Sequence, residues 1–338
     1  MYNKYLYKNP YHKEDISKNS FLVTGGAGFI GSNLVEYLLK YNASKVRVLD
    51  NLSNGYYENI KEFIGLPNFE FIEGDICNLE TCKEVVKDID FISHQAALGS
   101  VPRSIANPIM TNEVNVGGFL NMLYAAKESK SLKRFVYAAS SSTYGDSPYL
   151  PKIEGNEGNP LSPYAITKLV NELYGEVFSK VYGFHTIGLR YFNIFGPKQN
   201  PNNPYAAVIP IFCKTFIEKS SPTIFGDGNT SRDFTFVENA VQANVRALLF
   251  SSLEKHEVMN VACGDQISLN KMVDNLNELC QSNIKPIYGP ERRGDVRHSK
   301  ASIEKIEKFL GYKPKFYFKD GLDIVLNYYK EEYENRNG

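Results

Sequence analysis

The chain contains no tryptophan, few cysteines and no excess of charge of either sign. Its 38 Lys and Arg residues balance 38 Asp and Glu residues over 338 positions, so no overall field attracts a nucleic-acid backbone. No apolar run is long enough to cross a membrane, and the polar, tyrosine-rich N-terminus lacks the apolar core of a secretory signal. We therefore expect a cytoplasmic protein that binds neither nucleic acid nor membrane.

The five cysteines are odd in number and form no C-x-x-C pair, and the five histidines are scattered along the chain. This spacing argues against a disulfide framework and against a zinc cluster. We expect reduced thiols and no structural metal. A small anionic ligand would then be held by a few locally placed groups.

The first half of the chain alternates short β-branched or aromatic runs with longer helical patterns, which is typical of a parallel sheet. Apolar stripes at helical spacing occur at Ile30, Leu34 and Leu38, and again at Leu169, Leu173 and Val177. The pattern predicts an α/β fold with a doubly wound sheet. Its expected strands are 21–24, 46–49, 69–72, 91–94, 135–138 and 186–189.

Three regions follow from the change of pattern along the chain. Residues 1–18 form an N-terminal extension, 19–195 the dinucleotide-binding part, and 196–338 mainly a smaller α/β substrate-binding part, with some chain crossing back. A proline- and asparagine-rich connection, 196–204, marks the change. Because ligands of doubly wound sheets lie at the carboxyl ends of the strands, the second part is expected to close a cleft over that edge.

A glycine-rich turn follows the first expected strand and opens the first helix. Gly25 permits a sharp turn, Gly28 a close approach to a pyrophosphate at the positive helix terminus, and Gly31 close helix-to-strand packing. Asp50 ends the second strand, where a carboxylate binds the adenosine ribose and repels a 2′-phosphate. An ordinary strand-to-helix turn is the alternative, but the combination favours NAD.

Tyr164 and Lys168 are one turn apart at the start of a helix that Ser162 and Pro163 begin. An ammonium beside a phenol lowers the phenol pKa, so that Tyr164 can take a proton from an alcohol. A surface pair is the alternative reading. The serine-rich run 140–142 ends a strand at the same sheet edge and supplies a hydroxyl that can share this proton. It lacks the G-x-S-x-G surroundings of a serine nucleophile, and a plain serine-rich turn is its alternative.

Together these features resemble the extended short-chain dehydrogenase/reductase superfamily, whose sheet is Rossmann-like. The matching segments HQAALGSVPRS, AASSSTYGD, LSPYAITK, GLRYFNIFGP, GDGNTSRDF and RRGDVRHS are similar to NAD-dependent nucleotide-sugar epimerases, most of all bacterial UDP-N-acetylglucosamine (UDP-GlcNAc) 4-epimerases of polysaccharide biosynthesis. The resemblance covers nearly the whole chain.

The resemblance implies a set of residues for each role. The catalytic group is Tyr164, Lys168, Ser141 and Ser140. NAD would contact Gly25, Gly28, Phe29, Ile30, Gly31, Asp50, Asn51, Ser53, Asn54, Gly55, Asp75, Ile76, Gln95, Ala96, Ala97, Asn115, Tyr164, Lys168 and Tyr191. The UDP-sugar would contact Ser100, Arg103, Ser140, Ser141, Ser142, Asn193, Ala207, Val208, Phe225, Arg232, Arg292, Asp295 and Ser299.

The implied reaction inverts C4 of UDP-GlcNAc and of its galacto epimer UDP-GalNAc, and possible further substrates are UDP-glucose and UDP-galactose. It runs through a bound 4-keto sugar and NADH. Relatives that dehydrate the sugar carry an Asp-Glu pair after the catalytic hydroxyl, whereas this chain has Ser141, Ser142 and Thr143. Ser299 replaces a bulky tyrosine of strict hexose epimerases, which leaves space for an acetamido group.

Two alternatives stay open. A uronic acid or N-acetyluronic acid 4-epimerase is one, since Arg103 and Arg297 offer charge to a carboxylate. A regulator that binds NAD without catalysis is the other. The family also commonly forms homodimers, for which helices around 115–127 and 163–181 are candidates.

Overall fold

The computed structural model describes residues 4–201, 207–291 and 297–337. A seven-stranded parallel sheet has the strand order β11-β6-β5-β4-β1-β2-β3. Its strands are β1 (Ser20–Thr24), β2 (Lys45–Asp50), β3 (Phe69–Glu73), β4 (Phe91–His94), β5 (Arg134–Ser140), β6 (Thr186–Tyr191) and β11 (Glu257–Val261). This order is the doubly wound Rossmann arrangement, and all six expected strands are present within one or two residues of their predicted ends.

The seventh strand, β11, was not among the expected strands. It pairs in parallel with β6, from Glu257 beside Ile187 to Val261 beside Tyr191. Because β11 belongs to the second half of the chain, the segment 196–338 contributes to both parts of the molecule.

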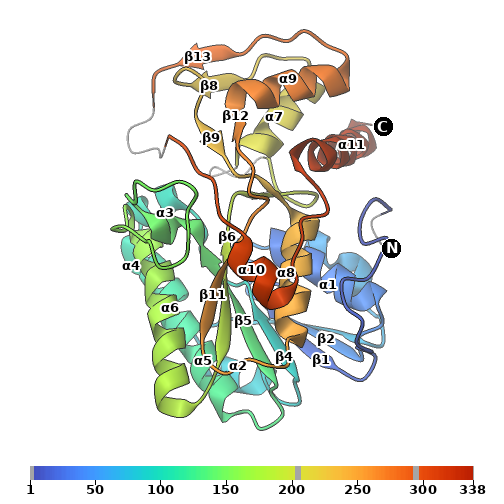
Figure 1. The fold of residues 1–338 in the computed structure, drawn as a ribbon. Helices are drawn as coiled ribbons and strands as arrows, with labels where there is room; N and C mark the ends of the chain where they lie inside the picture. The colour runs from blue at the N-terminus through green and yellow to red at the C-terminus, as the bar shows by residue number, and fades with distance from the viewer. Residues whose placement is uncertain (1–3, 202–206, 292–296, 338) are drawn as a thin grey trace.

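Helices cover both faces of the sheet (Figure 1). On one face pack α1 (Phe29–Lys40), α8 (Val237–Leu249) and α10 (Glu304–Leu310). On the other pack α2 (Leu79–Val85), α5 (Phe119–Glu128) and α6 (Pro163–Tyr182). The short helices α3 (Val101–Ala106) and α4 (Pro108–Asn112) lead through a π-helical turn, η3 (Glu113–Gly118), into α5.

The second part stands beyond the carboxyl ends of the strands (Figure 1). It holds α7 (Val208–Ile217), α9 (Leu269–Cys280) and α11 (Phe318–Asn337). Three two-stranded pairings accompany them: β7 (Ile194–Phe195) with β10 (Thr235–Phe236), β8 (Thr223–Phe225) with β13 (Ile287–Gly289), and β9 (Ser231–Arg232) with β12 (Ile267–Ser268). Among the described residues, no helix is both long and apolar enough to cross a membrane.

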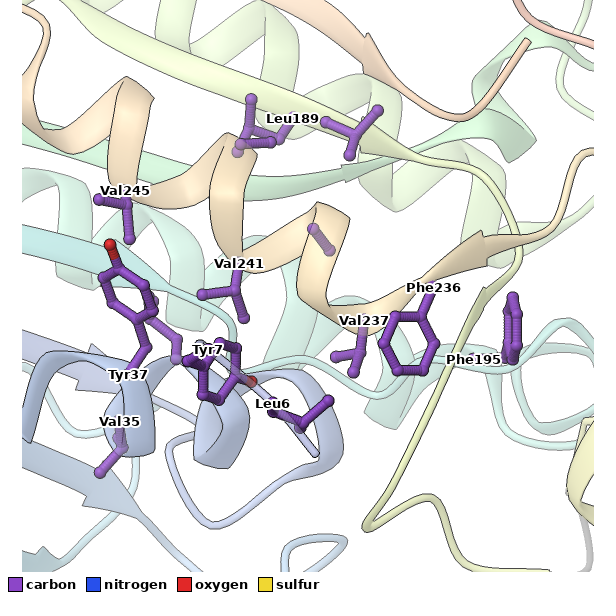
Figure 2. Close-up of a cluster of buried hydrophobic side chains, with 14 of the residues drawn as sticks. Leu6, Tyr7, Val35, Tyr37, Leu189, Phe195, Phe236, Val237, Val241 and Val245 are labelled. Carbon is purple, nitrogen blue, oxygen red and sulfur yellow. The ribbon is translucent and has the colours of Figure 1, made fainter. Parts of the chain in front are cut away.

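The N-terminal extension is part of the hydrophobic core. Leu6 and Tyr7 are fully buried, and Figure 2 shows them between α1 and α8, with Tyr7 close to Tyr37 of α1, whose ring centre lies 5.5 Å away. The Tyr7 hydroxyl donates to Asn33 Oδ1 at 2.9 Å, and the Tyr7 N–H donates to Glu238 Oε1 at 3.0 Å. The extension therefore fastens α1 to α8.

The apolar stripe of α6 faces outward. Leu173 and Val177 of the expected apolar stripe are each at least half exposed. The buried face of α6 carries Lys168, Asn171 and Glu172 together with small residues and one large apolar residue, Phe178. The helix thus turns its polar face toward the sheet, because that face serves the site described next.

Candidate active site

A cavity of about 1140 Å³ runs along the carboxyl edge of the large sheet. Its walls come from the residues that directly follow β1 to β6, from the start of α6, and from Lys198, Gln199, Asn200, Ala207, Arg232 and Ser299 of the second segment. A cleft of this size at this edge can hold both a dinucleotide and a second ligand.

The glycine turn between β1 and α1 is closely packed. Gly25 has φ +68°, and a Cβ at Gly31 would lie 2.2 Å from the Gly25 carbonyl oxygen. No side chain caps the N-terminus of α1, whose first residues Phe29, Ile30 and Gly31 line the cavity. The free N–H groups and the positive helix end therefore face the space that a diphosphate would occupy.

Asp50 joins the glycine turn to the loop after β2. Its Oδ2 accepts the Ala27 N–H at 3.0 Å and its Oδ1 accepts the Leu52 N–H at 2.9 Å. Burial raises the pKa of Asp50, and these backbone donors oppose the shift. A carboxylate has acceptor capacity beyond two hydrogen bonds, so Asp50 can also bind ribose hydroxyls from the cavity.

Polar residues of the loops after β2 and β3 surround the end of the cavity at which Asp50 lies. Asn51 donates to Asp75 Oδ2 at 2.9 Å, and Arg103 donates to Asn54 Oδ1 at 3.0 Å. Burial opposes ionisation of Asp75, but the Cys77 N–H and the Asn51 amide together lower its pKa. All the expected NAD contacts except Asn115 line the cavity.

Asn115 lies behind the cavity wall. Its side chain is buried, accepts the Leu98 N–H at 2.7 Å and donates to the Leu98 carbonyl and to Thr167. It holds the loop after β4 in shape, and its contact with NAD stays a prediction.

A hydrogen-bond network unites Gln95, Tyr191 and Asn244 at the middle of the cleft. Asn244 Nδ2 donates to the Tyr191 hydroxyl at 2.7 Å, which donates to Gln95 Oε1 at 3.1 Å, and Gln95 Nε2 donates back to Asn244 Oδ1 at 3.0 Å. Burial raises the pKa of Tyr191 to about 12, so the hydroxyl stays protonated. Asn244 lies on α8 and carried no sequence signal, since asparagine within an apolar helical pattern has no motif around it.

The catalytic group assembles where β5 meets α6. Ser140 ends β5, its hydroxyl acts to lower the Tyr164 pKa, and Ser142 donates to Ser140 Oγ at 2.9 Å. Ser162 caps α6 by accepting the Ala165 N–H, which fixes Tyr164 in the first helical turn. Of the serines in this run, Ser140 is therefore the one beside the phenol.

Lys168 is anchored to the end of β5. Its Nζ donates to the Ala138 carbonyl at 2.8 Å and lies 6.0 Å from the centre of the Tyr164 ring. We expected the ammonium to lower the Tyr164 pKa, but burial raises it, and the Ser140 hydrogen bond is the opposing influence. Burial also lowers the pKa of Lys168 to about 8, while Glu172 acts to raise it.

A buried ion pair between Arg190 and Glu172 lies next to Lys168. Arg190 at the end of β6 donates two hydrogen bonds to Glu172, at 2.9 and 2.7 Å, and also pairs with Glu157. The side chains of Arg190 and Glu172 are 5% and 8% exposed. Glu172 is one turn beyond Lys168 on α6, so the pair lies under the site.

The expected sugar-binding residues divide into three groups. Ser100, Ser140, Ser141, Ser142, Asn193, Ala207, Arg232 and Ser299 line the cavity. Arg103, Val208 and Phe225 do not line it, and Phe225 is 39% exposed on β8. Arg292 and Asp295 lie outside the described residues.

The walls fit NAD at the end that the glycine turn forms. The uncapped helix terminus suits a diphosphate, and Asp50 suits an unphosphorylated ribose. Gln95 and Tyr191, from the neutral amide and hydroxyl network with Asn244, line the same cavity. NAD bound here supplies reversible hydride acceptance.

Comparison with known proteins agrees with this geometry. Residues 21–262 match the NAD dependent epimerase/dehydratase family. A UDP-N-acetylglucosamine 4-epimerase from Methanobrevibacter ruminantium M1, solved with UDP-N-acetylmuramic acid, is 36% identical with a TM-score of 0.88, and the alignment covers 93% of this chain and 99% of that one.

Two further solved relatives handle other sugars. UDP-glucose 4-epimerase from Thermotoga maritima, solved with UDP-glucose, is 33% identical over 93% of this chain and 99% of that one, with a TM-score of 0.86. UDP-glucuronic acid 4-epimerase from Bacillus cereus, solved with UDP-glucuronic acid and NAD, is 30% identical over 93% of this chain and 100% of that one, with a TM-score of 0.85. The chain therefore belongs to the NAD-dependent epimerase/dehydratase family of extended short-chain dehydrogenases/reductases.

Proposed function

We propose that the protein is a UDP-sugar 4-epimerase and that UDP-GlcNAc and UDP-GalNAc are its preferred pair. The observation that carries the reaction type is the distribution of carboxylates. Among the described residues that line the cavity, only Asp50 and Asp75 are acidic, and both lie at the adenosine end. Elimination of water from a 4-keto sugar needs an acid and a base beside the sugar, whereas epimerisation needs only the proton and hydride transfers at C4.

In this mechanism Tyr164 removes the proton from the sugar 4-hydroxyl, and Ser140 hydrogen-bonds to the same oxygen. Lys168 binds the nicotinamide ribose and supplies positive charge near the phenol. Burial raises the Tyr164 pKa, so positive charge near the phenol, from Lys168 and from the nicotinamide of bound NAD, would favour proton removal. NAD bound at the glycine turn and Asp50 would supply reversible hydride acceptance at C4.

Inversion requires the sugar to turn while its diphosphate stays fixed. Arg232 lines the cavity on the side of the second part and is suited to the diphosphate, because guanidinium pairs well with phosphate oxygens. Small side chains, including Ala207 and Ser299, line the same part of the cavity and leave room for rotation.

The preference for acetamido sugars rests on Ser299. Its backbone N–H donates to the Ser231 carbonyl at 3.1 Å, which fixes its side chain at the cavity wall. Ser299→Tyr should reduce turnover of UDP-GlcNAc and UDP-GalNAc while sparing UDP-glucose and UDP-galactose. Equal loss on both pairs would contradict the assignment.

The reaction is tested by incubating the purified protein with UDP-GlcNAc and separating the products by chromatography, with NAD released on denaturation and quantified. Conversion to UDP-GalNAc that Tyr164→Phe abolishes supports the proposal. Absence of conversion of any UDP-sugar, with NAD still bound, would indicate the regulator instead.

We also propose a homodimer formed through α6. Ile166, Leu173, Val177 and Val181 lie on one side of this helix and are each at least half exposed. Such a continuous apolar stripe is typical of an interface. Light scattering should give twice the chain mass, and Val177→Glu should reduce it to one chain mass.

A further inference from the structure

Lys152 brings a positive charge to the cavity wall that sequence reasoning did not identify. It lies in the loop between β5 and α6, lines the cavity and is 5% exposed. Its backbone N–H donates to the Lys300 carbonyl at 2.7 Å, and its carbonyl accepts from Ser302 and Asn260. These bonds fix Lys152 beside the segment that carries Ser299.

The ammonium of Lys152 has little to balance its charge. Its one hydrogen-bond partner among the described residues is the Ser147 carbonyl oxygen, and no carboxylate of the described residues lies within 4.0 Å of it. An ammonium has three N–H donors, so two remain available. Burial accordingly lowers the pKa of Lys152.

The arginines that the sequence suggested for a sugar carboxylate are engaged elsewhere. Arg103 donates to Asn54 in the cofactor loop. Arg297 pairs with Asp227 at 2.9 Å, and its side chain is 63% exposed. Neither lines the cavity.

We propose that Lys152 is a specificity-determining residue that binds a carboxylate on the sugar, so that the site accepts UDP-hexuronic acids beside neutral UDP-hexoses. The proposal rests on the proposed 4-epimerase function. A buried ammonium without a counter-ion is stabilised most by an anionic partner, and a neutral hydroxyl gives much less. The absence of described acidic side chains from this part of the lining removes a competing partner.

UDP-glucose and UDP-glucuronate form a matched pair, since they differ only in a hydroxymethyl or a carboxylate at C5. In Lys152→Met, the ratio of kcat/KM for UDP-glucuronate to kcat/KM for UDP-glucose should fall at least about tenfold, which is the loss of one charge-assisted hydrogen bond. Lys152→Arg should restore part of the ratio. The control Arg297→Met should leave the ratio unchanged.

A fall of both kcat/KM values by the same factor in Lys152→Met would overturn the proposal, because Lys152 would then serve the shared diphosphate or the fold. A second measurement needs no variant. In the wild-type enzyme turning over UDP-GlcNAc, UDP-glucuronate should inhibit at least as strongly as UDP-glucose, and tenfold weaker inhibition would also overturn it. Absence of turnover on every UDP-sugar would instead reject the epimerase function itself.

Discussion

Glu172→Gln should destabilise the protein strongly. Both carboxylate oxygens of Glu172 accept from Arg190, and both side chains are less than a tenth exposed. Removing one partner of a buried pair costs about 3–5 kcal/mol, and we expect the lower end because Glu157 still pairs with Arg190. At roughly 2 °C per kcal/mol for a chain of this size, Tm should fall by about 6 °C.

The matched control is Glu176→Gln, the same change one turn further along α6. Glu176 pairs with Lys180, and these side chains are 50% and 70% exposed. Such a surface pair contributes no more than about 0.5 kcal/mol. Thermal unfolding followed by circular dichroism compares the two variants, and equal shifts in Tm would refute our account of the buried pair.

The Glu172→Gln variant also tests how Glu172 affects the pKa of Lys168. The pKa of Lys168 is lowered to about 8 by burial, and Glu172 opposes that shift. Without the Glu172 charge the pKa of Lys168 falls further, so the ammonium loses its proton at lower pH. The alkaline limb of the pH–activity profile should therefore move to lower pH in Glu172→Gln and stay in place in Glu176→Gln. Movement to higher pH would contradict the role given to Lys168.

Three further changes test the cofactor side and the N-terminal extension. Gly31→Ala places a Cβ 2.2 Å from the Gly25 carbonyl oxygen, so the purified protein should contain little NAD and should lose about 1–3 kcal/mol of stability to denaturant. Asn244→Leu leaves the Tyr191 hydroxyl without its donor and should cost about 1–3 kcal/mol and weaken NAD binding, measured by calorimetry. Tyr7→Ala empties a fully buried site and should cost about 3–5 kcal/mol in urea unfolding, and a loss below 1 kcal/mol would mean that the extension is not part of the core.

The parts of the fold that the sequence predicted well are local ones. The glycine turn and the six strands each carry their signal within a few neighbouring residues, because turn chemistry and β-branched runs act over short distances. β11 could not be predicted in the same way, because its run EVMNV, 257–261, has only two β-branched residues and gives a weak local signal.

The sequence was less informative about which face of a helix is buried and about which distant segments come together. Periodicity identified the apolar stripe of α6 but not the side on which it lies, and the buried face is polar because it carries Lys168 and Glu172. Lys152 looks like an ordinary surface lysine in a polar loop. Hydrogen bonds of its backbone to the segment 300–302 and to Asn260 place it at the cavity wall.

The position of β11 has a consequence for synthesis of the chain. Until residues 257–261 have left the ribosome, β6 has no neighbour on its outer side and presents unpaired N–H and C=O groups. An apolar, open strand edge readily pairs with other chains, so the nascent protein is prone to aggregate during this interval. A truncated chain that ends before β11 should keep this exposed edge permanently and be recovered mainly in inclusion bodies.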